Sequence, residues 1–286
     1  YRAAQDMSEY VLGLKNRSLM VVPKWQRGGR VSNINTALNY LSGDIVMVLD
    51  GDTSFDNNMV AMAVRHFIDP SVVAVSGCLR VRNADESLVA SLQAVEYFIS
   101  IQTAKTGLSE FNIVNNVYGA FGVFRHATVD LVKGWDAGTA EDLDMTIRIK
   151  QYFGRYGRKF RIVFDPEAIG FTDVPATLEG FFKQRQRWDG DLSFIYFKKH
   201  AKAFRPALVG WPNFLMLVIN GLYSQIVLPG ILFIYTIWLV FRYPLYYVLS
   251  LLLAVYIFYY LVLLVMYVTS VIFISERKKE DLKRLP

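Results

Sequence analysis

A long apolar stretch in the carboxyl-terminal third constrains the fold of this 286-residue chain more than any other feature. Between residues 207 and 274 the only charged residue is Arg242. A helix of roughly twenty apolar residues crosses the core of a bilayer. Two such runs fit here, at about 212–241 and 245–274. We therefore expect a transmembrane region over 207–274, because a buried helical pair of a soluble protein rarely contains two apolar runs of this length.

Basic residues flank the apolar region on both sides. Those before it are Lys198, Lys199, Lys202 and Arg205, and the tail at 275–286 is again rich in lysine and arginine. Positively charged flanks stay in the cytoplasm, so we expect a helical hairpin in the plasma or inner membrane, and hence a multi-pass protein with a cytosolic catalytic domain. The net charge of +6 is concentrated in these flanks, which indicates membrane lipid and no nucleic acid as a partner. The single cysteine, Cys78, excludes an internal disulfide.

The first 175 residues alternate apolar runs with helical patterns, which is typical of one α/β domain. We expect strands at 19–22, 45–49, 72–75 and 160–164, and helices at 32 to about 41, 56–67 and 86–105. Ser32 and Asp56 are the expected N-caps of the first two helices. Strands that are apolar throughout are buried on both faces, which predicts a parallel sheet covered by helices. Ligands bind such sheets where the strands end.

Two acidic residues follow the strand expected at 45–49, in the sequence Asp50-Gly51-Asp52. Carboxylates one residue apart suit Mg²⁺ or Mn²⁺, which prefers hard oxygen ligands and keeps positions open for phosphate. An ordinary turn is the alternative, since Asp-Gly is common in turns. The place of the motif at a strand end favours a metal and nucleotide site. The histidines lack metal-ligand spacing and are interpreted as structural or surface residues: His66, His126 and His200.

A second acidic pair, Glu141 and Asp142, opens an expected helix. Thr139, three residues before an acid, also resembles the start of a capping box. Capping and catalysis are compatible, because a carboxylate held at a helix start is ionised and oriented. We interpret Asp142 as a general base and Glu141 as its support.

Two glycine-containing loops carry further candidates. Arg27 and Arg30 enclose a Gly-Gly pair just before the helix expected at Ser32, and a helix N-terminus favours bound diphosphate. Gly119 and Phe121 lie in a loop of small residues that would let a sugar approach the backbone. From these residues alone, a solvated loop and an ordinary strand bend explain the two segments at least as well.

The pentad Gln184-Arg185-Gln186-Arg187-Trp188 lies in an amphipathic interfacial helix region expected at 176–206. In a helix, Gln184, Arg187 and Trp188 share one face. Arginine matches phosphate oxygens, and tryptophan offers a flat surface for a sugar ring. The alternative is a surface helix in which Arg187 pairs with Asp191.

The order of these motifs resembles the membrane-integrated processive family 2 glycosyltransferases, which include the synthases of cellulose, chitin, hyaluronan and poly-N-acetylglucosamine. The likeness runs from about Lys24 to Trp188 and includes Asn35, Phe124-Arg125, Gly134-Trp135-Asp136 and Val174-Pro175. It implies a GT-A (Rossmann-like) fold followed by an interfacial helix and transmembrane helices. It also implies a nucleotide-sugar donor, a UDP-sugar, and inversion at the anomeric carbon.

The resemblance implies a role for each motif residue. It assigns metal and donor binding to Asp50 and Asp52, proton abstraction to Asp142, and diphosphate and acceptor binding to Gln184, Arg187 and Trp188. Arg30 stands where the family usually has lysine, and Ala140 where it has threonine or serine. Neither change removes a charge that the chemistry requires. The family's first strand and nucleoside-binding aspartate would precede Tyr1, so we expect the catalytic domain at 1–175 to be incomplete and further membrane helices to lie outside this chain.

Three hypotheses follow. The leading one is a processive synthase that extends a β-linked polysaccharide and exports it, alone or with an accessory subunit. The second is a single-transfer enzyme acting on a glycolipid acceptor, and the third is a non-catalytic scaffold of an export complex. The acids at 50, 52 and 142 favour an enzyme over a scaffold.

Overall fold

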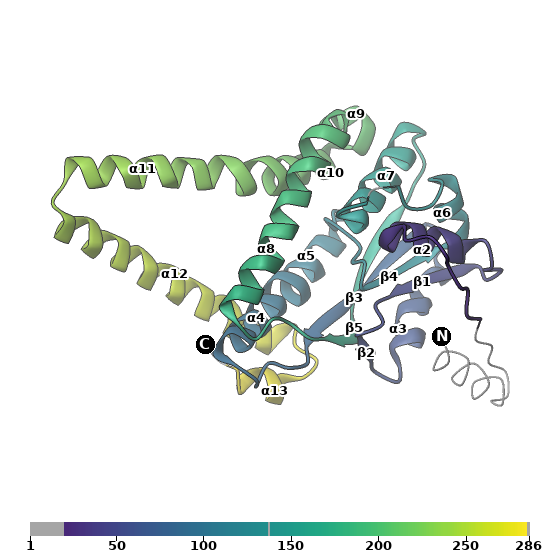
Figure 1. Ribbon diagram of the computed structural model, residues 1–286, viewed down its shortest axis with the longest axis horizontal. Coiled ribbons are helices and arrows are strands. Elements are labelled where there is room, and N and C mark those ends of the chain that lie inside the picture. Colours follow the sequence, from purple (N-terminus) through teal and green to yellow (C-terminus); the bar gives the residue numbers. More distant parts are fainter. Residues whose placement is uncertain (1–19, 137, 285–286) are drawn as a thin grey trace.

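A five-stranded mixed sheet forms the centre of the α/β unit in the computed structural model, which describes residues 20–136 and 138–284 (Figure 1). Its strands are β1 (Ile45–Leu49), β2 (Ser54–Phe55), β3 (Val72–Val81), β4 (Phe121–Arg125) and β5 (Arg161–Thr172), in the order β1-β4-β3-β5-β2. Only β3 and β5 pair in parallel, and β4 is antiparallel to both β1 and β3. The expected parallel sheet is therefore wrong. The reason is that β4 enters from the opposite end, after a long helical excursion and a loop.

The first expected strand, at 19–22, is not seen. Leu19 lies outside the described residues, and Met20–Val22 form no strand. The other three expected strands are confirmed, and β3 and β5 continue well beyond their predicted ends. β1 alternates between half-buried and buried positions because it lies at an edge of the sheet.

The predicted helices around the sheet are all present, and α6 (His126–Leu131) is an additional helix that was not predicted. The predicted ones are α2 (Gly29–Leu38), α3 (Met59–Arg65) with η1 (His66–Ile68), α4 (Leu88–Tyr97), η2 (Phe98–Thr103), α5 (Ala104–Glu110) and α7 (Glu141–Arg155). The helix expected at 86–105 corresponds to α4, the π-helical η2 and α5 in succession, with Ser87 Oγ accepting from Ala90 N at 3.1 Å.

The predicted N-caps are wrong. α2 begins at Gly29 rather than after Ser32, because Gly29 adopts a φ of +68° that glycine alone tolerates well. At α3 the backbone carbonyl of Asp56, not its carboxylate, accepts from Met59 N. α7 follows Ala140 at a φ of +43°, without any side-chain cap.

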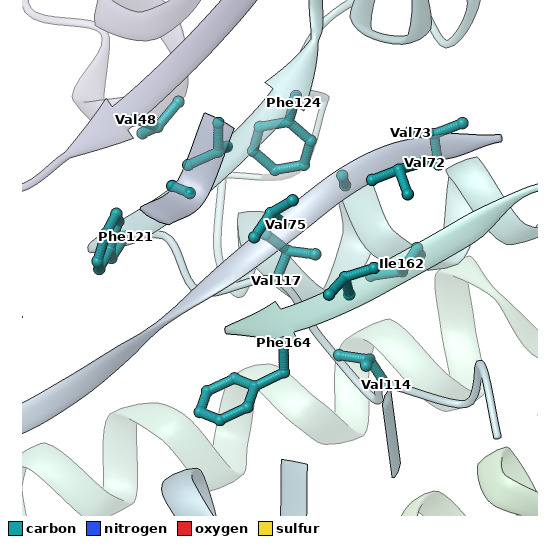
Figure 2. Packing of buried hydrophobic residues seen from close by; sticks show 14 of the residues in the cluster. Val48, Val72, Val73, Val75, Val114, Val117, Phe121, Phe124, Ile162 and Phe164 are labelled. Carbon is teal, nitrogen blue, oxygen red and sulfur yellow. The ribbon is translucent and has the colours of Figure 1, made fainter. Parts of the chain in front are cut away.

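The core lies between β3, β4, β5 and the helices packed on them. Figure 2 shows Val75 of β3, Phe121 and Phe124 of β4, and Ile162 and Phe164 of β5 directed into it. The ring of Phe121 lies against Phe55 with a 5.1 Å centroid separation. This packing holds the ends of β1 and β4 in place, and the candidate site lies at those ends.

The carboxyl-terminal part leaves the α/β unit and returns to it (Figure 1). Its elements are α8 (Leu178–Ser193), η3 (Phe194–Lys199), η4 (Ala201–Ala203), α9 (Pro206–Val209), α10 (Trp211–Leu217), η5 (Val218–Val227), α11 (Leu228–Arg242), α12 (Leu245–Phe273) and α13 (Lys278–Leu282). Two continuous helices, Trp211–Arg242 and Leu245–Phe273, are long and apolar enough to cross a membrane. Their ends agree with the expected spans to within one residue. Figure 1 shows the pair as a V that points away from the sheet.

The segment after α12 is anchored to the α/β unit. Arg80 of β3 donates to both carboxylate oxygens of Asp281 at 3.0 Å, and Tyr267 Oη donates to the carbonyl of Asp281 at 2.7 Å. Arg277 donates to Asp56, just after β2, at 2.6 Å. The second apolar helix is therefore attached to the sheet edge beside the Asp-Gly-Asp turn.

The first apolar helix is attached through α9, which packs on α7. The contact depends on Gly154, because a Cβ added there would lie 2.2 Å from the carbonyl oxygen of Leu208. The backbone of α9 cannot move away from an added Cβ as a flexible side chain could.

Gly154→Ala should therefore lower stability, by about 1–3 kcal/mol as for other overpacked sites. Gly107→Ala is the matched control, since Gly107 is also helical and has no atom within 4 Å of an added Cβ. That change should be neutral or stabilising by up to about 1 kcal/mol. The measurement is the apparent melting temperature of the protein in detergent micelles, and equal melting of Gly154→Ala and the unaltered protein would contradict the close packing.

Candidate active site

Arg30 joins three segments that are distant in the sequence. Its guanidinium forms an ion pair with Asp50, donates from Nη2 to the carbonyl of Gly119 at 2.7 Å, and places Nε 2.7 Å from Oε1 of Glu141. α2 therefore meets the end of β1, the loop before β4 and the start of α7. Asp50, Gly119 and Glu141, all predicted site residues, lie around this one cation.

Gly119 is needed for this arrangement. A Cβ at position 119 would lie 3.0 Å from Oε1 of Glu141 and 3.2 Å from Nη2 of Arg30. Burial raises the pKa of Glu141 above its ordinary value, and the charge of Asp142 adds to that effect, while Arg30 acts in the opposite direction. A side chain at position 119 would push apart the ion pair that holds Glu141.

The Asp-Gly-Asp turn is fixed through its backbone. Asp50 N donates to Ala120 O at 3.3 Å, and Thr53 N donates to Asp50 O at 3.2 Å. Arg82 Nη2 donates to Asp52 O at 3.1 Å, and the same guanidinium binds both carboxylate oxygens of Asp173, at 2.5 and 2.9 Å. The carboxylate of Asp52 is exposed to solvent. The turn is thus held rigid while one carboxylate stays accessible.

The carboxylate of Asp142 is oriented by one hydrogen bond to each oxygen. Oδ1 accepts from Leu143 N at 2.7 Å, and Oδ2 accepts from Asn116 Nδ2 at 2.9 Å. Thr146 Oγ1 donates to Asp142 O at 2.8 Å and accepts from Val117 N at 2.9 Å. Asp142 is half-buried, so an acceptor hydroxyl can reach it.

α7 is fastened to the membrane-proximal region by Asp144, which is fully buried. Its carboxylate lies 2.9 Å from Arg148 Nε, 2.9 Å from Lys199 Nζ and 2.7 Å from His200 Nε2. Burial opposes ionisation, but hydrogen bonds from His200 and Lys199 and the charge of Arg148 lower the pKa of Asp144 to about 2. Sequence reasoning missed this role. It interpreted His200 as structural, and the partnership with Asp144 agrees with that.

The pentad lies on α8, as expected, but its ionic contact uses a residue that was given no role. Arg185 binds both carboxylate oxygens of Glu96 on α4, at 2.8 and 2.6 Å, and its guanidinium lies 4.8 Å from the Trp188 ring centroid. Oε1 of Gln184 is buried, and no described residue donates to it. Arg187 is exposed. Within the described parts of the chain, no hydrogen bond or ion pair joins Gln184, Arg187 or Trp188 to the acids.

Two other predicted site residues lie outside the cluster. Arg27 is exposed and makes no ion pair among the described residues. Phe121 is fully buried against Phe55, so its side chain is not accessible to an acceptor sugar, and the approach of a sugar to the backbone of this segment stays a prediction. Phe121 was placed in a loop, but it is the first residue of β4, where one face of the strand points into the core.

A divalent metal would need ligands from its substrate here. Over residues 20–136 and 138–284, no three His, Cys, Asp or Glu side chains could hold a metal together. Asp50 and Asp52 can supply two hard oxygen ligands, and Mg²⁺ and Mn²⁺ commonly complete their shells with phosphate and water. The donor set thus fits a metal that binds together with a nucleotide diphosphate.

An Asp-Gly-Asp turn at the end of a strand, joined through Arg30 to an acidic pair at a helix start, is typical of a GT-A-type glycosyltransferase. The chain belongs to glycosyl transferase family group 2, whose family model matches residues 45–273. The resemblance inferred from the motifs is confirmed, and so is the GT-A fold.

Individual relatives agree with this assignment. The chain is 30% identical over 188 residues to the poly-β-1,6-N-acetyl-D-glucosamine synthase of Staphylococcus aureus, an alignment that covers 65% of this chain and 44% of the relative. It is 28% identical over 176 residues to the enzyme of the same name from Staphylococcus epidermidis, covering 61% and 41%. The chain thus spans less than half the length of these relatives.

A solved structure shares the fold. The mannosyltransferase PcManGT from Pyrobaculum calidifontis, in complex with GDP-Man and Mn²⁺, superposes with a TM-score of 0.54 at 21% identity. The match covers 72% of this chain and 54% of that one.

Asp144→Asn should lower stability at pH 7 by about 3 kcal/mol, the cost of removing one partner from a buried ion pair. The folded pKa of Asp144, about 2, is below its ordinary value of 3.8. Its stabilising effect is therefore fully present above pH 3.8 and lost as the pH falls through about 2. The melting temperatures of the variant and the unaltered protein should converge over that range. Asp130→Asn is the control, because that carboxylate is 71% exposed. A difference in melting temperature between Asp144→Asn and the unaltered protein that does not change with pH would contradict the role of Asp144.

Proposed function

We propose that this protein is an inverting glycosyltransferase that moves a sugar from a nucleotide diphosphate sugar to the end of a growing β-linked polysaccharide. The observation that carries the proposal is the meeting of Asp50 and Glu141 at Arg30, with Asp142 beside Glu141 at the start of α7. The two staphylococcal relatives, named as synthases of poly-β-1,6-N-acetyl-D-glucosamine, make N-acetylglucosamine the first sugar to test.

Asp142 is the proposed base. Its carboxylate accepts one hydrogen bond at each oxygen, which leaves lone pairs free for the incoming hydroxyl. As the acceptor oxygen bonds to the anomeric carbon, the bond from that carbon to the diphosphate oxygen breaks and the proton passes to Asp142. Attack from the side opposite the leaving group inverts the configuration. Glu141 supports the base by holding Arg30 at the same helix start.

The leaving diphosphate needs positive charge. Asp50 and Asp52 would hold Mg²⁺ or Mn²⁺, which would stabilise the charge that develops on the departing oxygen. Arg30 supplies a protein cation beside Asp50, and its fork of donors matches phosphate oxygens. Arg27 lies in the segment just before α2, the helix that carries Arg30, and adds a second positive charge there.

The pentad would complete the site from the membrane side. Gln184 Oε1 lacks a described donor and Arg187 is exposed, so both are open to contact with a diphosphate. Trp188 offers a ring face to the acceptor sugar. Gly119 would let that sugar approach the backbone of the loop before β4. Arg185 has a different task, because it ties α8 to α4 through Glu96.

The two apolar helices support a multi-pass membrane protein. Both of their basic flanks lie next to the α/β unit, which fits a cytosolic catalytic domain with a short turn at Arg242 on the other side. The same proposal includes three further parts: a polysaccharide or glycolipid acceptor at the membrane surface, export of the product, and an accessory subunit.

A donor screen on the protein in lipid tests the proposal. Radiolabelled UDP- and GDP-sugars with Mn²⁺ should yield a β-linked product, with UDP-N-acetylglucosamine as the best donor. Asp142→Asn should lower the rate by about 100-fold or more, the usual contribution of a general base, while donor affinity is kept. Asp130→Asn is the control, an acid on α6 whose side chain is 71% exposed.

Two outcomes would overturn parts of this account. One sugar per acceptor and no polymer would leave a single-transfer enzyme. Unchanged turnover in Asp142→Asn would remove the base and favour a scaffold.

A further inference from the structure

Lys105 is a buried cation that the proposed chemistry does not use. It lies on α5 with 1% of its surface exposed. Its Nζ donates to Asn116 O at 2.6 Å and to Asn116 Oδ1 at 2.9 Å, and it lies 3.1 Å from the centroid of the Tyr118 ring. Burying a lysine is costly unless its hydrogens find partners. Here the two oxygens and the ring face supply three.

These contacts determine which way the Asn116 amide points. A lysine ammonium has donors and no acceptor, so the amide oxygen of Asn116 must face Lys105. The amide NH₂ then faces the other way, where Nδ2 lies 2.9 Å from Oδ2 of Asp142. If the amide were reversed, NH₂ would face an ammonium and the oxygen would face a carboxylate. Both contacts would be repulsive.

The orientation of Asp142 depends on this amide. Leu143 N fixes Oδ1 from within α7, and Asn116 fixes Oδ2 from the loop before β4. Without the second bond, the carboxylate could rotate about the first. A general base must lie within hydrogen-bonding reach of the proton that it removes.

We infer that Lys105 is a positioning residue for the proposed base: it locks the Asn116 amide, which in turn holds the carboxylate of Asp142 toward the acceptor. The inference rests on the proposed function, in which Asp142 receives the acceptor proton.

The two bonds from Lys105 to Asn116 can form in either protonation state of the lysine. Burial lowers the pKa of Lys105 well below its ordinary value, while the charge of Asp142 acts to raise it. The two bonds need two N–H hydrogens, which both the ammonium and the neutral amine possess. Because the neutral amine also has a lone pair, only the ammonium excludes the reversed amide by itself, and in the neutral state the carboxylate of Asp142 opposes the reversal.

A second buried lysine provides a matched control. Lys150 is 2% exposed, and its Nζ donates to Val114 O at 2.6 Å, two residues before Asn116 in the same loop. It does not contact Asn116 or Asp142 in the described structure. Lys105→Met and Lys150→Met therefore each remove one buried lysine beneath the same loop, but only the first releases the amide.

The test compares steady-state kinetics of these two variants and Asn116→Ala. Lys105→Met should lower kcat by about ten-fold or more through misplacement of the base, with the KM for the donor unchanged. Lys150→Met should keep kcat within about two-fold, since nothing next to the base changes. Equal losses in the two lysine variants, or a loss confined to the donor KM, would overturn the inference.

A double-variant cycle separates positioning from general loosening of the loop. If Lys105 acts through Asn116, Lys105→Met should add nothing to the loss caused by Asn116→Ala. If the fold-losses in kcat of the two single variants multiply in the double variant, Lys105 does not act through Asn116. Asn116→Ala alone also keeps the test decisive if Lys105→Met does not fold, because full activity without the amide would overturn the inference.

A structure of Lys105→Met separates this inference from the proposed function. The bond from Asn116 to Asp142 should be lost or the amide reversed. If the bond is retained, the inference fails even when the unaltered enzyme transfers sugar. If the bond is lost in Lys105→Met and the unaltered protein transfers no sugar, the positioning of Asn116 by Lys105 is supported and only the proposed function fails.

Discussion

The ion pairs of Arg30 are the interaction on which the rest of the site depends. Two acids, Asp50 and Glu141, approach each other at the meeting point of a strand end and a helix start, and one guanidinium between them offsets their repulsion. The same side chain binds the carbonyl of Gly119 and so closes the loop before β4. Like charges brought together in a partly desolvated place require such a counterion. A donor diphosphate and its metal would supply new partners for both Arg30 and Asp50.

The site is also connected to the two apolar helices, by contacts outside the motifs. Asp144 ties the helix that carries Asp142 to the region that leads into the first apolar helix. Arg277 and Asp281, after the second, bind the edge of the sheet near the Asp-Gly-Asp turn. The two apolar helices are thus attached to the catalytic unit at two places, which fixes their position relative to its acids.

Much of the fold could be predicted, because periodicity and charge are local properties. The lengths of the apolar runs defined both membrane-length helices, and the apolar segments at 45–49, 72–75 and 160–164 became strands. Strand direction was not predictable, since the antiparallel entry of β4 depends on where a long excursion returns. Helix starts were missed at Ser32 and Asp56, because α2 begins at Gly29 without a side-chain cap and at α3 the backbone carbonyl of Asp56 accepts the bond that its carboxylate was expected to accept.

The candidate site was predicted where the residues carry a chemical pattern and missed where only the fold brings them together. Asp50, Asp52 and the pair at 141–142 were found from spacing and strand ends. Phe121 was predicted to lie in a loop, but it begins β4. Nothing in the neighbouring residues distinguishes the last position of that loop from the first position of the strand. Arg82 and Lys105 have no motif of their own: they act on Asp52 and Asn116 across the sheet and between helices, contacts that no spacing encodes.

The most direct test of the central claim is a crystal structure with Mn²⁺ and a nucleoside diphosphate, with the metal located by anomalous scattering. The account predicts a manganese peak at the carboxylates of Asp50 and Asp52, with the diphosphate beside Arg30 and the carboxylate of Asp142 facing the open side. A manganese ion and nucleotide bound away from both aspartates would contradict it.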